Sequence, residues 1–295
     1  MFLPPAKGGG RENTMSNLVL PVNRISDYLE KAAKTFWEKD PIRIHDNAIL
    51  TGFERLDEAI GGMKRGGLYL LGGAPGMGTT AFALNLANNV AVKRPGCVLY
   101  HTNQTSALAL TKRMIRLIGK IAWDTKKEDA EADEAIKEAV RILEESSLFF
   151  SDTKVKMVSE FMHKNPMLQL KRKPDLIIID SLEGINNADS RNEKLVDCKN
   201  LAVHFDCPVL VIMKCKEEKV SAGSYELTIG SIGMERITKQ VDTVFALNQA
   251  DKYDPDCDMK GIAELSILRS DSCNPQKIPF VAIDDFGCYI SMGRC

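Results

Sequence analysis

The stretch LYLLGGAPGMGTTAFALNLANNVA, residues 68–91, joins an apolar run to a helix-forming segment through a glycine-rich turn. The apolar run predicts a buried strand, and the segment 79–92 predicts a helix. Gly73, Gly76 and Gly78 let the backbone curl, so that successive N–H groups point inward beside the positive end of the helix. This strand–loop–helix pattern predicts a loop that cradles a phosphate group.

One position in this loop departs from the usual phosphate-binding pattern, Gly-x-x-x-x-Gly-Lys-Ser/Thr. Thr79 stands where the pattern has lysine, whereas Thr80 keeps the hydroxyl that would bind Mg²⁺. Loss of a charge-assisted contact to the β- and γ-phosphates costs roughly 1.5–3 kcal/mol of binding free energy. Lys64, Arg65 or Lys214 could supply a substitute charge. Two outcomes therefore stay open: a loop that binds ATP and Mg²⁺ weakly, or one that keeps only its shape.

Outward from this loop, short apolar runs alternate with helix-forming stretches. Strands are predicted at 68–73, 97–102, 148–152, 175–180, 208–213, 242–247 and 264–269. Helices are predicted at 106–119, 126–146 and 156–170. Continuous apolar strands that alternate with helices indicate an α/β fold, with a parallel sheet covered on both faces. The end of the chain predicts a hairpin that turns at Asp285–Gly287.

Length and composition suit one large α/β domain with short appendages. The 295 residues are 44% hydrophobic and carry a formal net charge of −1, so overall charge does not predict a nucleic-acid binder. We predict a disordered leader over 1–21, an amphipathic linker helix over 22–44 and the main domain over 45–295. The linker helix has two open roles, packing on its own domain or docking on a neighbouring subunit.

Three further features narrow the class of protein: the cysteines, the histidines and the length of the apolar runs. The eight cysteines form no Cys-x-x-Cys pair, and the four histidines show no metal-ligand spacing. We expect free, mostly buried thiols and assign no metal to the histidines. No apolar run reaches the length of a membrane span, and the N-terminus lacks a signal-peptide pattern. We therefore expect a cytoplasmic protein with no membrane partner.

The segment 51–91 resembles the opening of the C-terminal ATPase domain of the DnaB-type replicative helicases, above all in TAFALNLA at 80–87. The likeness spans about residues 45–295, and its other parts are LFFSDTK (148–154), LIIIDSLEGI (176–185), PVLVIMKCKEE (208–218), QVDTVFAL (240–247) and the terminal hairpin. The resemblance implies a RecA-like P-loop NTPase core, a mostly parallel twisted sheet flanked by helices, with a C-terminal β-hairpin. It also implies assembly into hexameric or helical rings, ATP and Mg²⁺ as cofactors, and ATP-dependent DNA helicase activity.

Carried over position by position, the resemblance places unexpected residues in the catalytic site. Gln104 stands where the family has the glutamate that activates the attacking water, and a carboxamide orients water but cannot accept its proton. Asp180 keeps the position of the aspartate that holds Mg²⁺ through water, with the capping of a turn as its other reading. Lys214 stands at a family glutamine. Glu183 could be a displaced base or an ordinary solvated loop residue.

The resemblance also covers the residues that contact a neighbouring subunit. Arg269 and Asp271 align with a Lys-x-Arg pair whose arginine reaches the γ-phosphate of the next subunit. An acidic Asp271 would repel a triphosphate there instead of stabilising its transition state. The segment 230–240 aligns with the family's DNA-contacting loop and the helix after it, and differs in detail.

Three functions remain open on these grounds. The losses at Thr79, Gln104 and Asp271 favour a catalytically degenerate DnaB-like paralogue, a pseudoenzyme linked to DNA replication. Such a protein would regulate or cap a replicative helicase ring, or form its own homo-oligomer on single-stranded DNA. The alternatives are an active but divergent ATP-dependent DNA helicase or translocase, and a RecA-like recombination mediator.

Overall fold

The computed structural model describes residues 47–127, 129–155, 157–158, 160–163, 172–185, 190–215, 227–230, 240–254 and 256–292. The chain divides into two units, Met1–Pro41 and Ile42–Cys295. All described residues belong to the second unit. The predicted leader and linker helix lie outside the described residues, as does most of the segment 230–240.

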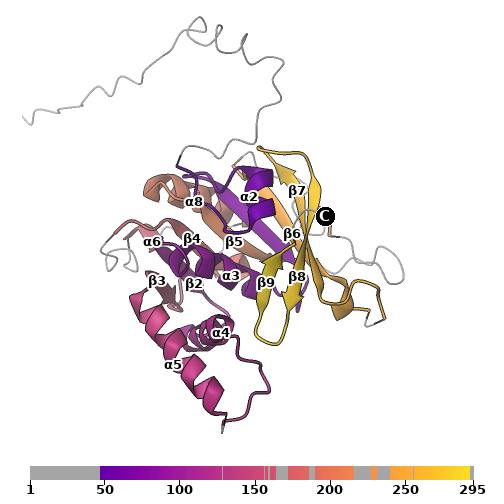
Figure 1. Ribbon diagram of the computed structural model, residues 1–295. Helices are drawn as coiled ribbons and strands as arrows, with labels where there is room; N and C mark the ends of the chain where they lie inside the picture. Colours follow the sequence, from indigo (N-terminus) through magenta and orange to yellow (C-terminus); the bar gives the residue numbers. More distant parts are fainter. Residues whose placement is uncertain are drawn as a thin grey trace, which may run out of the picture. The chain divides into compact units, whose positions relative to one another are not determined.

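A nine-stranded sheet forms the centre of the domain, in the order β3-β2-β4-β5-β1-β6-β7-β8-β9 (Figure 1). Its strands are β1 (Leu68–Gly73), β2 (Val98–Thr102), β3 (Leu148–Ser151), β4 (Leu176–Asp180), β5 (Val209–Lys214), β6 (Thr243–Gln249), β7 (Ile262–Ser270), β8 (Gln276–Ile283) and β9 (Cys288–Ser291). Every pair from β3 to β6 is parallel. The α/β fold with a mostly parallel sheet is confirmed, and so is the C-terminal hairpin, formed by β8 and β9.

The strand predicted at 264–269, β7, is antiparallel to both of its neighbours, β6 and β8, and so lies outside the parallel part of the sheet. A parallel neighbour needs a crossover connection, usually a helix. Between β6 and β7 the described residues, 250–254 and 256–261, hold only the 3-10 helix η2 (Ala250–Lys252). Along β7, buried and partly exposed residues alternate, as is typical of an antiparallel strand with one covered face.

Helices cover both faces of the sheet. The helical elements are α2 (Glu54–Ile60), α3 (Thr79–Ala91), α4 (Ala107–Gly119), α5 (Ala130–Glu145), α6 (Glu160–His163), α8 (Arg191–Phe205) and the 3-10 helix η1 (Leu182–Gly184). Side chains of α2, α3 and α4 share one apolar cluster with the sheet, and those of α6 and α8 share the other. Of the helix predicted over 156–170, the described part is α6.

Sequence analysis missed α8, although its start carries a readable signal. The Ser190 side chain accepts a hydrogen bond from the Glu193 N–H, and the Glu193 carboxylate accepts one from the Ser190 N–H. This reciprocal capping box satisfies two N–H groups that a helix end leaves unpaired. The residues that α8 buries against β1 and β5 are Leu195, Cys198, Leu201 and Ala202.

An aromatic cluster holds the C-terminal hairpin against α3. The ring centroids of Phe53 and Phe82 lie 5.1 Å apart, and Phe280 packs edge-on against Phe82 at 5.4 Å. Tyr289 also packs edge-on against Phe82, at 5.3 Å. Aromatic pairs in this geometry contribute about 0.5–1.5 kcal/mol each beyond their buried area. The cluster therefore fixes β8 and β9 beside the N-terminus of α3.

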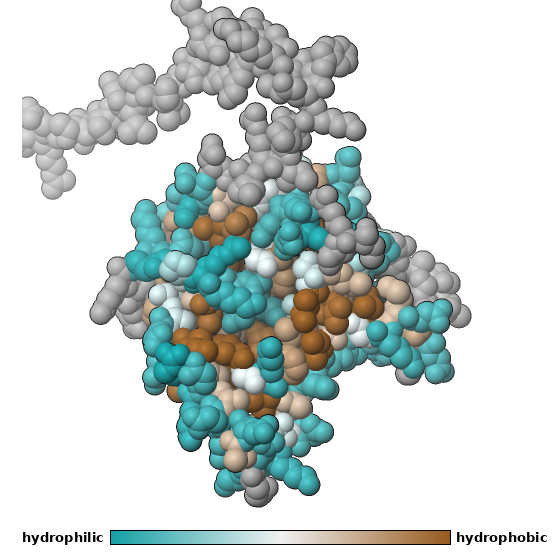
Figure 2. Space-filling view, in the orientation of Figure 1, coloured by the Kyte–Doolittle hydropathy of each residue, from teal (hydrophilic) through white to brown (hydrophobic). Residues whose placement is uncertain are grey.

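The surface shows both hydrophobic and polar regions. Hydrophobic atoms gather beside β8 and β9 on the face in Figure 2, and Ile290 of β9 is 49% exposed. In the part of the chain that the structure describes, no helix is long and apolar enough to cross a membrane. The described cysteines are free thiols, as expected: Cys97, Cys198, Cys207 and Cys215 are buried, and Cys257, Cys273 and Cys288 are partly exposed.

Candidate functional site

The phosphate loop, residues 73–80, lies at the carboxyl-terminal edge of the parallel strands, between β1 and α3. Gly76 and Gly78 have φ angles of 86° and 84°, in the left-handed region that favours glycine. A Cβ atom at Gly73 would lie 2.4 Å from the Thr79 Cγ2 atom. The glycines predicted from the sequence therefore permit this curl of the backbone.

The lysine position of the loop holds a short side chain turned back on the loop. The Thr79 methyl group lies over Gly73, where the close approach of its Cγ2 atom leaves no room for a Cβ. Among the described residues no side chain caps the N-terminus of α3. The first N–H groups of α3 are therefore left for an anion, but no ammonium group extends from residue 79 toward it.

Asp180 lies at the end of β4, directly beside the start of α3. The Thr80 hydroxyl and the Tyr100 hydroxyl both donate hydrogen bonds to its Oδ2 atom, each over 2.8 Å. Only 6% of Asp180 is exposed. Burial raises the pKa of the carboxyl, and the two hydroxyl bonds and the charges of Arg113 and Lys214 offset this only in part. The two residues predicted to hold Mg²⁺, Thr80 and Asp180, are thus in contact.

Gln104 follows β2 and lies beside Ser181, the residue after Asp180. Its side-chain amide donates a hydrogen bond to the Ser181 hydroxyl. Asn103 bonds the same residue twice, donating to the Ser181 carbonyl at 2.7 Å and accepting from the Ser181 N–H at 3.2 Å. The peptide bond between Asp180 and Ser181 is cis. The structure therefore brings Gln104 and Asp180 into one site.

The end of β5 places one cation beside the phosphate loop. Lys214 pairs in register with Gly73, and its side chain is exposed. The next N–H, that of Cys215, donates to the Gly73 carbonyl at 3.1 Å. Glu183, the alternative base, lies in η1, 3.6 Å from the Arg191 guanidinium. Of the substitutes weighed from the sequence, Lys214 lies at the loop and Glu183 is held by an ion pair.

Lys64 and Arg65 do not lie near the loop, so the prediction that either could replace its lysine is wrong. Both precede β1, whose six residues separate them from the loop. Arg65 instead pairs with Asp175 at 3.1 Å and donates to the Asp206 carbonyl. Closeness in the sequence misled here because a strand carries its two ends to opposite edges of the sheet.

Arg269 and Asp271 also lie away from the phosphate loop of their own chain. They form an ion pair of 3.3 Å at the end of β7, and the Asp271 N–H donates to the Asp242 carbonyl. The register pairs Ser270 with Thr243, the first residue of β6. The structure therefore leaves this pair at the edge of the sheet opposite the loop.

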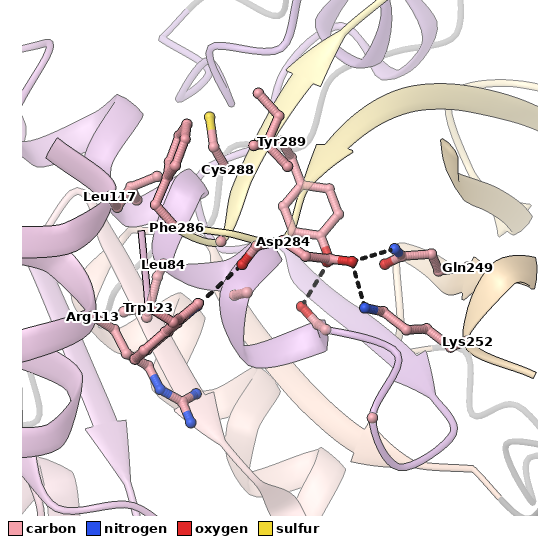
Figure 3. Close-up of a pocket in the computed structure, with 15 residues that line it drawn as sticks. Leu84, Arg113, Leu117, Trp123, Gln249, Lys252, Asp284, Phe286, Cys288 and Tyr289 are labelled. Atoms are coloured by element: carbon pink, nitrogen blue, oxygen red, sulfur yellow. Dashed lines mark hydrogen bonds and ion pairs between the residues drawn. The ribbon is translucent and has the colours of Figure 1, made fainter. Parts of the chain in front are cut away.

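A cavity of about 150 Å³ adjoins the loop, between α3, α4 and the hairpin (Figure 3). Residues that sequence analysis did not assign to the site line it, among them Arg113, Trp123, Gln249, Lys252, Asp284 and Tyr289. They come from segments far apart in the chain, and no local pattern marks them.

Hydrogen bonds tie the walls of this cavity together (Figure 3). The Trp123 indole N–H donates to the Asp284 carbonyl at 3.1 Å, and Tyr289 donates to the Gly78 carbonyl at 3.4 Å. The Asp284 carboxylate accepts from Gln249 at 3.2 Å and pairs with Lys252. The Gln249 Oε1 atom is buried and has no partner among the described residues. The cavity thus offers an apolar wall beside the loop.

The residues around the loop include several groups that suit an anion. The curled backbone, the uncapped helix and Thr80 with Asp180 are groups that hold a phosphate and its metal. Thr79 and Gln104 lack the charge and the basicity that phosphoryl transfer uses. The described site therefore presents groups that suit a phosphate.

Comparison with known proteins agrees with the fold. The model of the DnaB-like helicase C terminal domain family matches residues 48–272. The chain is 25% identical to the replicative DNA helicase DnaC of Bacillus subtilis and 26% identical to DnaB of Geobacillus stearothermophilus. Each match covers 83% of this chain and 57% of the relative, so the chain spans little more than half the length of these relatives. A solved DnaB-like replicative helicase has a similar fold, with a TM-score of 0.78 at 21% identity, over 92% of this chain and 68% of that one.

Proposed function

The chain belongs to the family of DnaB-like helicase C-terminal domains, and we propose that it serves DNA replication as a member that does not hydrolyse ATP. It binds nucleotide weakly and acts as a regulatory or structural partner. Its site of action is a replicative helicase ring, or a homo-oligomer on single-stranded DNA. Family membership favours this branch over a recombination mediator.

The observation that carries the proposal is the contact of Thr79 with Gly73, which fills the lysine position with a methyl group. Gln104, bonded to Ser181, adds the loss of the general base. Each such group supplies several kcal/mol of transition-state stabilisation, of order 3 kcal/mol for one donor. Two losses in one site remove most of the rate acceleration that a P-loop enzyme provides.

The Arg269–Asp271 ion pair supports a regulatory role in a ring. By the family resemblance, this edge faces the nucleotide of the next subunit. An arginine already paired with an acid 3.3 Å away offers that nucleotide less positive charge. We therefore expect that a helicase subunit next to this chain loses the stabilisation that its neighbour normally supplies.

A steady-state ATPase assay with and without single-stranded DNA tests the proposal. We expect no turnover above background, with an active DnaB helicase as the positive control. The variant Thr79→Lys with Gln104→Glu should stay inactive while Asp271 remains. Turnover on the order of one per second by the unmodified chain would remove the proposal.

A second function, an active divergent translocase, has one observation in its favour. Thr80 and Asp180 are retained 2.8 Å apart, and Lys214 lies beside Gly73. If this function holds, the chain unwinds a forked DNA duplex, and Asp180→Ala abolishes unwinding. Absence of unwinding by the unmodified chain would exclude it.

A further inference from the structure

A groove lies between α4 and α5, and we infer that it is a docking site for an acidic amphipathic helix of a partner protein. The two helices lie side by side at one end of the sheet, next to β3 (Figure 1). The groove has a volume of about 320 Å³, and none of the residues that line it belongs to the phosphate loop. This surface therefore lies outside the site of the proposed function, and its role does not depend on whether ATP is hydrolysed.

The floor of the groove is apolar and partly open to solvent. Ile115 of α4, Ile121 and two residues of α5, Ala132 and Ile136, line it. Ile121 is buried, whereas Ile136 is 38% exposed. Ala132 and Ile136 are four residues apart, so they lie on the same face of α5 as one apolar stripe. Covering this stripe removes apolar area from water, which favours a partner with an apolar face of its own.

The rim of the groove is basic. Four cations and one acid line it: Lys112, Arg116, Lys126, Lys127 and Asp133. The Arg116 guanidinium holds the end of α4, since it donates to the Ile121 carbonyl at 3.4 Å and lies over the Trp123 ring, 4.7 Å from its centroid. The three lysines are exposed, and they make no ion pair within the part of the chain that the structure describes. Unpaired ammonium groups therefore surround the apolar floor, although the chain as a whole carries a net charge of −1.

The face of α5 that points away from the groove differs, because its charges are paired with one another. Lys137 lies 3.0 Å from Glu134, and Arg141 lies 2.7 Å from Glu138 and 2.8 Å from Glu145. The unpaired positive charge of this pair of helices is thus concentrated at the groove. Lysines beside an apolar stripe are complementary to carboxylates beside an apolar stripe.

An acidic helix from another protein suits this surface better than other occupants. Among the described residues that line the groove, no aromatic ring offers a base a stacking platform, whereas the aliphatic floor suits apolar anchors at i, i+3 and i+4. The segment 22–44 of this chain, predicted to be amphipathic, has five basic and four acidic residues and does not complement a basic rim. The acids of α5 on a second copy are already paired. The charges therefore favour a partner segment rich in Asp and Glu.

Fluorescence anisotropy of the full chain with a labelled peptide tests the inference. The probe is a synthetic helix of about 16 residues, with Leu at i, i+3, i+4 and i+7 and Glu at the flanking positions. We expect saturable binding, and about tenfold weaker binding when Lys replaces each Glu of the peptide. A rise in salt from about 0.05 M to about 0.5 M should weaken binding of the acidic peptide, because exposed charges are then screened.

Two variants place the binding on the groove. Lys126→Glu reverses a charge of the rim, and Ile136→Gln removes the exposed part of the apolar floor; each should weaken binding of the acidic peptide about fivefold. The matched controls are Lys137→Glu and Leu108→Gln. Lys137 and Leu108 are exposed on the same two helices and do not line the groove, so each control should keep the Kd within about twofold. Thermal unfolding checks that all four variants fold.

Absence of saturable binding by the acidic peptide would overturn the inference, and so would equal losses in the groove variants and their controls. The other occupants are tested with a peptide of residues 22–44 and with an oligothymidylate of about 20 nucleotides. If either binds more tightly than the acidic peptide and loses affinity in Lys126→Glu, the groove serves that ligand instead. Self-association of the chain that Ile136→Gln abolishes would likewise contradict a foreign partner.

Discussion

The two ends of the parallel sheet treat their aspartates in opposite ways. At the amino-terminal end, Asp175 accepts from the Cys97 N–H at 2.9 Å and pairs with Arg65 at 3.1 Å and Arg172 at 2.8 Å. At the carboxyl-terminal end, Asp180 contacts neutral hydroxyls, and its cations act without a direct ion pair. At the amino-terminal end, the aspartate is neutralised by direct ion pairs with arginines. At the carboxyl-terminal end, the cations near the aspartate stay available for a ligand.

The pKa directions follow from this difference. Burial is the largest influence on both carboxyls and raises the pKa of each. At Asp175 the Cys97 N–H and the two arginines outweigh burial, and the pKa is lowered. At Asp180 burial prevails, and the pKa is raised. A charge in contact with its partners therefore stabilises the fold, whereas a buried charge held by hydroxyls reduces its stability.

The largest expected change in stability comes from substitution of a glycine, and its size should differ between the two ends of the sheet. Gly78→Ala places a side chain at a φ of 84°, with its Cβ 2.1 Å from the hydroxyl of Tyr289, which packs on Phe82. Gly66→Ala, near the amino-terminal end, has a φ of 69° but no contact closer than 3.8 Å. We expect a loss of about 3 kcal/mol in unfolding free energy for Gly78→Ala and about 1 kcal/mol for Gly66→Ala. Urea denaturation measures both, and equal losses would contradict the crowding inferred at the loop.

The next largest change in stability is expected at Asp175, at the amino-terminal end of the sheet. Asp175→Asn removes the charge that Arg65 and Arg172 share, and we expect a loss of about 2 kcal/mol in unfolding free energy at neutral pH. Because the folded pKa of Asp175 is lowered, its contribution is present above the unfolded value of about 3.9 and is lost as pH falls through the folded pKa. Denaturation from neutral to acid pH should show the gap between variant and unmodified chain close in acid. A gap independent of pH would show that the charge is not responsible.

The smallest change in stability is expected at Asp180, at the carboxyl-terminal end of the sheet. Asp180→Asn keeps an oxygen that accepts from Thr80 and Tyr100, and we expect a change within about 1 kcal/mol at neutral pH, toward greater stability. Because the folded pKa of Asp180 is raised, its charge opposes folding above that pKa, and this penalty disappears as pH falls. The same pH series measures it. A large loss at neutral pH would mean that the Asp180 charge is stabilised after all.

The sequence was sufficient for what local patterns encode. The strand, the turn glycines and the helix over 68–91 are contiguous, and their periodicity predicts them directly. The resemblance singled out Gln104 as a site residue, and the structure places its side chain beside Ser181. The helix α8 was missed although Ser190 and Glu193 mark its start.

What the sequence could not supply is contact between distant segments. Tyr100 stands 80 residues before Asp180, and only the neighbouring places of β2 and β4 in the sheet bring their side chains together. The cavity residues Trp123, Gln249 and Asp284 meet in the same way. The antiparallel pairing of β7 with β6 depends on how short the connection between them is, which apolar content alone does not specify.

The most direct test of a phosphate loop without catalytic groups is a crystal structure of the chain with Mg²⁺ and a non-hydrolysable ATP analogue. We predict Asp180 still bonded to Thr80 and Tyr100, Thr79 turned over Gly73, and no lysine or carboxylate beside the γ-phosphate position. A structure with a coordinated Mg²⁺ ion, another lysine on the phosphates and a carboxylate aligned with the attacking water would contradict it.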